Sequence, residues 1–140
     1  MFQYSVNGQM FYEPWTTFAT KIATSSNVTY VFEPDQSFVV DERLPMVPTN
    51  VTLDFNGCSL NCKTPIFVRN CGTIKNGKVI FDQYTFEEEE NAQGLVCSIN
   101  ENKIEQIELS FNSVTFKNAS VNCGCISGYN CGVISDCKVT

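Results

Sequence analysis

The first part of the chain carries a helical pattern of apolar positions. Trp15, Phe18 and Ile22 recur at spacings of three and four residues, which places them on one face of an α-helix. We therefore expect a short helix over residues 14–27, with residues 1–13 as an N-terminal extension. A helix of about three turns is only marginally stable alone, so its apolar face needs a surface to pack on.

From residue 28 onward the pattern changes to that of β-strands. Short runs of β-branched and aromatic residues alternate with turn residues such as Asn-Gly and Pro-Asp. The runs occupy residues 28–32, 37–40, 50–55, 65–68, 78–81, 94–99, 107–111 and 113–116. The segment 86–94 is polar and acidic instead, and we expect it to form a solvated loop.

The strand region also repeats itself. Residues 70–79, NCGTIKNGKV, match residues 130–139, NCGVISDCKV, at six of ten positions. Residues 116–121 give a third copy of the pattern and residues 53–57 a looser one, which together indicate a period of about 20 residues. In each copy an Asn or Asp lies between two apolar positions, where it can turn the chain.

A unit of this size cannot bury its own apolar face, whereas stacked coils can. The repeat therefore predicts a β-solenoid over residues 28–140. The competing fold is an antiparallel sandwich, in which Asn56-Gly57 and Asn76-Gly77 would be hairpin turns. The sandwich gives no reason for the long-range self-match, so the solenoid is favoured.

The C-terminal motif resembles a known repeat. Residues 124–137, GCISGYNCGVISDC, resemble the GLUG repeat of bacterial surface proteins, and a degenerate second copy begins at Gly94. The helix followed by NVTYVFEPDQSFVV and NVTLDFNGCSL is similar to the N-terminal end of right-handed parallel β-helices of the pectate-lyase-like superfamily. This resemblance implies an all-β, single-stranded right-handed parallel β-helix, with a short α-helix that caps its first coil.

The same resemblance implies roles for individual residues. The core ladder would consist of Ile74, Val79, Phe116, Val121, Ile134 and Val139. One equivalent turn position would be shared by Asn76, Asn118 and Asp136. Cys71 and Cys131 would share another position, three coils apart.

The charge balance and the missing histidine exclude several functions. Nine Lys and Arg residues face 15 Asp and Glu residues, and the net charge of −6 disfavours nucleic-acid binding. Without histidine the chain lacks the commonest general base and every His-containing metal site. The chain shows no apolar run long enough to span a membrane and no signal-peptide pattern at its start. We expect no cofactor and no metal.

Cysteine is frequent for a chain of this kind. The eight cysteines are Cys58, Cys62, Cys71, Cys97, Cys123, Cys125, Cys131 and Cys137. They form no CxxC pair, so a zinc ribbon is not supported. Most are expected to be buried apolar thiols, with one or two disulfides as the alternative. Glycosylation sequons at Asn27, Asn50 and Asn118 matter only in a secretory pathway.

The favoured function is non-enzymatic. The ends of a stacked β fold are strand edges, and the predicted helix covers only one of them. The other end, with Gly132, Val133, Ile134 and Val139, is the expected assembly end. Either more chain follows in the natural protein, or a second copy or another structural protein stacks there, as in a filament, a surface adhesin or a virion shell.

The alternative is a protein that binds or cleaves polysaccharide. A cleaving enzyme would draw on Asp35, Asp41, Glu42, Asp54, Asp82, Asp136, Arg43 and Arg69. No two of these acids occupy matching positions in adjacent copies, which argues against catalysis. A carbohydrate-binding module would instead use Tyr12, Tyr84 or Tyr129 as stacking surfaces.

Overall fold

The computed structural model describes residues 1–87, 92–117 and 122–140, and it is all-β apart from one helix. Asn118 and Val121, expected as a turn residue and a core residue, lie outside the described residues. Within the described part, no helix has the length and apolar character needed to cross a bilayer. The predicted all-β class is thus confirmed.

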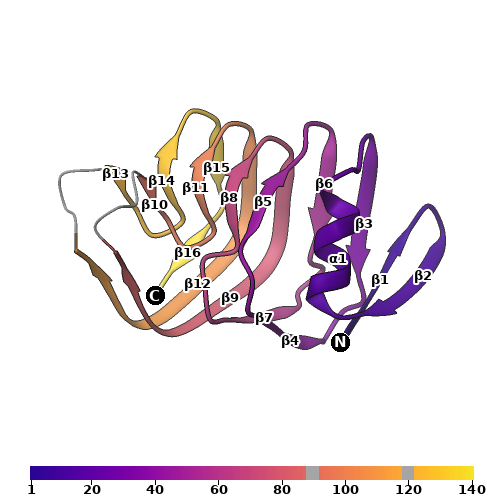
Figure 1. Cartoon of the computed structure of the whole chain (residues 1–140), viewed down its shortest axis with the longest axis horizontal. Coiled ribbons are helices and arrows are strands. Elements are labelled where there is room, and N and C mark those ends of the chain that lie inside the picture. The colour runs from indigo at the N-terminus through magenta and orange to yellow at the C-terminus, as the bar shows by residue number, and fades with distance from the viewer. Residues whose placement is uncertain (88–91, 118–121) are drawn as a thin grey trace.

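The N-terminal extension is a β-hairpin. Strands β1 (Phe2–Val6) and β2 (Gln9–Glu13) pair in antiparallel fashion around Asn7-Gly8. Both turn residues have positive φ, 51° and 77°, as a two-residue hairpin turn of this kind requires. Strand β1 also pairs in antiparallel fashion with β3 (Val28–Phe32), so the hairpin continues the sheet at the N-terminal end of the molecule (Figure 1).

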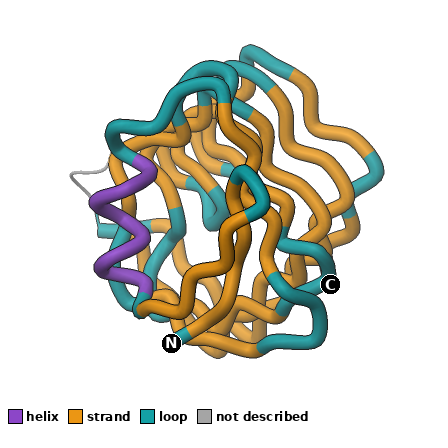
Figure 2. Tube along the Cα trace, turned by 90° about the vertical axis from the view of Figure 1, so that its right-hand side faces the viewer, coloured by secondary structure: helices purple, strands orange, loops and turns teal. Residues whose placement is uncertain are grey.

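Helix α1 (Trp15–Ile22) is shorter than the expected range of 14–27. Its buried face consists of Trp15, Phe18 and Ile22, as the spacing predicted. Figure 2 shows the helix and the β1–β2 hairpin side by side at the near end of the molecule. Together they cover the interior of the first strands.

After the helix, the chain runs repeatedly through three parallel ladders in the same order. The first ladder contains β3, β6 (Val51–Asp54), β9 (Thr73–Phe86), β12 (Lys103–Phe116) and β15 (Val133–Ser135). The second contains β4 (Ser37–Val40), β7 (Ser59–Cys62), the continuations of β9 and β12, and β16 (Lys138–Val139). The third contains β5 (Leu44–Val47), β8 (Phe67–Asn70), β11 (Cys97–Asn100) and β14 (Ser127–Asn130). A short fourth ladder pairs β10 (Ala92–Gln93) with β13 (Asn122–Cys123).

One passage through the ladders is called a circuit below, and the circuits differ in length. In the early circuits Val28 pairs with Val51, and Thr52 pairs with Thr73. The expected period of about 20 residues therefore describes these circuits well. From β9 to β12 and from β12 to β15, the register partners lie 30 residues apart, as do the asparagines of the third ladder. The later circuits are longer because they contain the 14-residue strands β9 and β12 and the additional fourth ladder.

This register changes two expectations from the repeat. The long-range self-match spans two of the longer circuits, so Cys71 and Cys131 lie two circuits apart, not three. The turns of the competing sandwich are also absent from the described part. Asn76-Gly77 is a bend inside β9, and Asn56-Gly57 joins strands that belong to different parallel ladders.

The expected acidic loop over 86–94 is shorter than predicted. Strand β9 continues to Phe86, which is fully buried, and β10 begins at Ala92. Gln93 is also fully buried, so both ends of the segment belong to the packed structure. Residues 88–91 between them lie outside the described residues.

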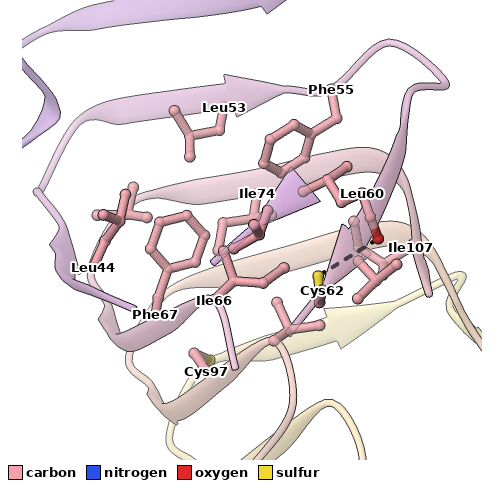
Figure 3. Packing of buried hydrophobic residues seen from close by; sticks show 14 of the residues in the cluster. Leu44, Leu53, Phe55, Leu60, Cys62, Ile66, Phe67, Ile74, Cys97 and Ile107 are labelled. Atoms are coloured by element: carbon pink, nitrogen blue, oxygen red, sulfur yellow. Dashed lines mark hydrogen bonds between the residues drawn. The ribbon is translucent and has the colours of Figure 1, made fainter. Parts of the chain in front are cut away.

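The core runs through the interior of the ladders. In Figure 3, Leu53 and Ile74 of the first ladder converge with Leu44, Phe67 and Cys97 of the third. All five are buried, and each lies directly opposite its neighbour in the ladder. Full burial of a side chain of this size contributes roughly 1.5–3 kcal/mol.

Candidate functional site

Apolar side chains that point inward stack in columns, with one residue from each circuit. The burial of these side chains changes abruptly at the last circuit. Val79, Leu109 and Val139 are successive members of one column. Val79 and Leu109 are each 1% exposed, whereas Val139 is 43% exposed. No described strand lies beyond β16, so this face of Val139 is uncovered. The predicted core position of Val139 is right in register but wrong in burial.

A second column behaves in the same way. Ile74 and Ile104 are fully buried, and Ile134, which follows them in register, is only half-buried. Ile107 is buried, and the corresponding residue of the last circuit, Cys137, is half-buried. In the earlier circuits, the apolar surface of each circuit is covered by the next one. The last circuit therefore leaves its apolar surface uncovered.

Phe116 belongs to another column. Its ring stacks on that of Phe86, with centroids 5.1 Å apart and an interplanar angle of 6°. The two residues are register partners, and Phe116 is half-buried. Phe116 is therefore not equivalent to Ile74 and Ile134, and the expected third copy of the repeat at 116–121 is wrong. The true intermediate copy lies at 100–109, midway between the other two.

The predicted turn position is shared by Asn76 and Asp136, with Gln106 between them. Their φ angles are 60°, 54° and 55°, respectively, in the left-handed region. Gln106 takes the place that the sequence pattern assigned to Asn118. Sequence reasoning missed it because glutamine is not a usual residue for left-handed backbone.

Three asparagines form a hydrogen-bonded column along the third ladder. Asn70 Nδ2 donates to Asn100 Oδ1 at 2.9 Å, and Asn100 Nδ2 donates to Asn130 Oδ1 at 2.8 Å. The amides also bind backbone: Asn70 Nδ2 donates to Lys103 O at 3.0 Å and Asn100 Nδ2 to Val133 O at 3.3 Å. Sequence reasoning noted the asparagines at positions 70 and 130 but not the one between them. The recurrence of asparagine at half of the offset was the available signal.

The backbone at this end has a free edge. The N–H of Val133 donates to Asn102 O at 2.7 Å, and that of Thr140 donates to Leu109 O at 2.9 Å. Successive residues of a strand direct their N–H and C=O groups to opposite sides, so those of Ile134 and Val139 point away from β12. No described strand lies on that side. Unpaired groups of this kind can bind another strand.

The four residues expected at the assembly end have different roles. Val133 is 54% exposed and lies outside the apolar columns of Ile134 and Val139. Gly132 is fixed by close packing, since a Cβ there would lie 2.0 Å from Asn102 O. The edge is therefore formed by β15 and β16, with Gly132 holding the strand close to the circuit before it.

A cap of aromatic residues covers part of the opposite end of the molecule. Phe2, Phe18 and Phe32 are buried there in a cluster of contacting rings. Trp15 joins the cluster and donates from Nε1 to Glu42 O at 2.9 Å, which ties α1 to the first circuit. The predicted cap is thus larger than the helix alone.

A charged group lies within this cap. Lys21 Nζ is 2.6 Å from Glu13 Oε1 and 3.1 Å from the Tyr4 hydroxyl oxygen, and it lies 3.7 Å from the centroid of the Phe11 ring. Burial raises the pKa of Tyr4 to about 12. Burial alone would lower the pKa of Lys21, but its hydrogen bonds to Glu13 and Tyr4 raise it. The contact between Lys21 and Glu13 thus connects α1 to β2.

The eight cysteines, all within the described residues, form no disulfide. Only Cys58, Cys62 and Cys97 are buried, so the expectation that most of the eight would be buried is wrong, and Cys123 and Cys131 are exposed. The other three, Cys71, Cys125 and Cys137, are half-buried. Burial raises the pKa of both Cys62 and Cys97 to about 12, so these thiols are protonated at neutral pH. An inert protonated thiol is suited to packing.

The candidate catalytic acids are dispersed and several have structural partners. Among the described residues, no group of three acidic or cysteine side chains could hold a metal ion. Asp54 Oδ1 accepts from Asn76 Nδ2 at 3.0 Å, and Asp82 Oδ1 accepts from Asn112 Nδ2 at 2.7 Å. Arg69 forms an ion pair with Glu101. The remaining acids of the set, Asp35, Asp41, Glu42 and Asp136, are exposed.

The surfaces suited to carbohydrate are likewise separated. A groove follows the corner between the first two ladders, and its lining residues are Asn56, Gly57, Asn76, Gly77, Lys78, Gln106 and Glu108. Tyr12 and Tyr129 are exposed but lie on β2 and β14. Tyr84 is half-buried against Phe81 and Phe86. None of the three tyrosines lines this groove.

Comparisons with known proteins add no relative. No family model matches the chain, and searches of curated proteins and of solved structures each found no match. What the described residues define is therefore an all-β fold with an aromatic cap over its first strands and no strand paired on the outer side of β15 and β16.

Proposed function

We propose that this chain is a non-enzymatic structural module, a right-handed parallel β-helix that assembles with copies of itself or with a partner protein through its C-terminal edge. The observation that carries the proposal is the exposure of Val139 in a column whose earlier members are buried. The parallel pairing between successive circuits supports the β-helix assignment.

The C-terminal edge combines two kinds of unsatisfied surface, backbone and side chain. The edge carries unpaired backbone groups at Ile134 and Val139, which an added strand would bind. The same two residues carry the apolar side chains that an added circuit would bury. A partner that adds strands at this edge would therefore satisfy backbone and side chains together.

Sedimentation velocity over a range of protein concentrations tests this proposal. We expect the native chain to associate, and Val139→Lys to weaken association by at least tenfold, because a charge would be buried in the contact. Val39→Lys is the matched control, since Val39 is also an exposed strand valine, 50% exposed, but lies on β4. Equal effects of the two substitutions, or a native chain that stays monomeric at every concentration, would overturn self-association through this edge.

A further inference from the structure

We propose that Cys71, Met46 and Glu101 form a surface site for a soft monovalent metal ion, Cu(I). The three side chains come from successive circuits and supply a thiolate, a thioether and a carboxylate. The site shares no residue with β15 or β16, so this inference is independent of the proposed function. Sequence reasoning expected no metal, because the donors lie 25 and 30 residues apart and only the stacking of circuits brings them together.

The third ladder positions all three donors. Strands β5, β8 and β11 are neighbours in this ladder, as Figure 1 shows. Met46 lies on β5, while Cys71 and Glu101 directly follow β8 and β11. The N–H of Cys71 donates to Val47 O at 2.9 Å. The N–H of Glu101 donates to Asn70 O at 2.8 Å. Cys71 and Glu101 therefore hold equivalent positions at one corner of successive circuits.

Both other donor atoms lie close to the sulfur of Cys71. The Sγ atom of Cys71 is 3.6 Å from Met46 Sδ and 3.3 Å from Glu101 Oε2. One ion with metal–sulfur bonds of about 2.3 Å and a metal–oxygen bond of about 2.1 Å can contact atoms at these separations. The donors can therefore bind an ion without a rearrangement of the backbone.

Packing does not account for the contact between the two sulfur atoms. Met46 is 40% exposed and Cys71 is half-buried, so their contact removes little apolar surface from water. A methionine that serves as a core residue would instead be buried. The exposure of this pair also leaves both sulfur atoms accessible to an ion from solvent.

Ligand type and charge both favour a soft ion of charge +1. Thiolate and thioether sulfurs favour Cu(I), whereas structural Zn(II) sites take four ligands from Cys, His, Asp and Glu. Glu101 also forms an ion pair with Arg69, so these two charges cancel. The Cys71 thiolate and a monovalent ion cancel in the same way. A divalent ion would instead leave a net positive charge beside Arg69.

Binding exchanges a proton for the ion. Without metal, burial and the neighbouring Glu101 carboxylate raise the pKa of Cys71, and its thiol donates to Glu101 Oε2 at 3.3 Å. The sulfur–metal bond forms as the S–H bond breaks, and the proton leaves to the solvent. The ion thus takes the place of the proton between Cys71 and Glu101, with no change in the oxidation state of ion or protein.

Methionine methyl NMR with Ag(I), a soft and redox-inert analogue of Cu(I), tests the site in the native chain. The chain contains three methionines, Met1, Met10 and Met46, so a ¹³C-methyl label gives three resonances, and Met46→Leu assigns one of them. We expect Ag(I) in chloride-free buffer to shift the Met46 resonance and to leave those of Met1 and Met10 unchanged. Cys71→Ser should abolish the shift, because the central ligand is lost.

The affinity for Cu(I) is measured in a chain that keeps Cys71 but lacks the other accessible thiols, through Cys123→Ser, Cys131→Ser, Cys125→Ala and Cys137→Ala. Cu(I) is titrated anaerobically against a chromophoric chelator, and circular dichroism verifies the β structure. Met46→Leu should weaken binding by at least tenfold, because it removes one sulfur ligand. Met10→Leu is the matched control, since Met10 is also an exposed strand methionine and should leave binding unchanged.

Three results would contradict the metal site or its ion. A Met46 resonance that stays in place once Ag(I) has saturated Cys71 overturns the site. Equal Cu(I) affinities of Met46→Leu and Met10→Leu also overturn it, because the thioether then plays no part. A shift of the Met46 resonance by Zn(II) at the same concentration overturns the assignment to a soft monovalent ion. None of these results bears on the association tested with Val139→Lys, so the two proposals fail separately.

Discussion

At the scale of single residues, the asparagine column explains how polar side chains are tolerated in the interior. Asn70 and Asn100 are fully buried, yet each amide binds both the next asparagine and a backbone carbonyl of the next circuit. Each carboxamide oxygen also accepts from the backbone N–H two residues later, as at Gly72 and Asn102. The column therefore fixes the stacking register where apolar contacts alone would not.

Asn100→Ala should lower the free energy of unfolding by about 2–4 kcal/mol, because it removes an acceptor of the buried Asn70 amide and the donor to Val133 O and Asn130 Oδ1. Asn130→Ala is the control, since Asn130 is exposed at the end of the column and should cost less than about 1 kcal/mol. Urea unfolding at neutral pH measures both. Equal losses would show that the column does not stabilise the interior.

The buried thiols predict a pH dependence of stability. Because burial raises the pKa of Cys62 and Cys97 to about 12, the folded thiols stay protonated while those of the unfolded chain ionise. The stabilisation is complete below the ordinary thiol pKa and is lost as pH rises toward about 12. The free energy of unfolding should thus fall between pH 8 and pH 10.5, approaching ~1.4 kcal/mol per pH unit for each thiol.

Urea unfolding under reducing conditions checks this dependence. The double variant Cys62→Ala/Cys97→Ala should be less stable at pH 8 but should lose less stability at alkaline pH. The residual slope of the variant reports the other titrating groups, including Tyr4. Parallel pH curves for the native chain and the variant would contradict the prediction.

At the scale of elements, the capped end depends on a contact between β2 and α1. The carboxylate of Glu13 is buried and binds Lys21, which also lies over the Phe11 ring. The helix has only eight residues, so its stability comes from this contact and from its apolar face rather than from its own hydrogen bonds.

Lys21→Met should lower the free energy of unfolding by about 1–3 kcal/mol, because it leaves the Glu13 carboxylate buried without its partner. The value is below that of a fully buried pair because the Lys21 side chain is 35% exposed. Adding Glu13→Gln should restore part of the loss. A thermal melt of the single and double variants measures this coupling, and additive losses would argue against it.

The elements show what local sequence can and cannot predict. Strands 28–32 and 37–40 and the face of α1 were predicted correctly, since alternation and helical spacing are local signals. The hairpin at the start was missed, although Asn7-Gly8 between apolar runs is a hairpin signal. The separate runs 107–111 and 113–116 proved to be parts of one long strand, β12. Strand continuity across Asn112 depends on pairing with β9, which local sequence does not encode.

At the scale of the whole molecule, the two ends differ in kind. At one end aromatic residues form a cap, whereas at the other end Ile134 and Val139 are uncovered. The sequence predicted this asymmetry in outline, because only the first segment has a helical face. It could not predict the circuit length, since the offset between the two matching segments is compatible with two circuits or three. Only the pairing of Ile104 with both Ile74 and Ile134 decides between them.

The equal steps from β9 to β12 and from β12 to β15 have a consequence for how this chain can change during evolution. A duplication or loss of one such unit would shift every later side chain by one strand spacing, ~4.8 Å, and leave all inward columns inward. An insertion of a single residue within a paired strand would move apolar residues to the solvent face. Molecules of this design can therefore vary in length through whole units of gene sequence, while the cap at one end and the strand edge at the other stay the same.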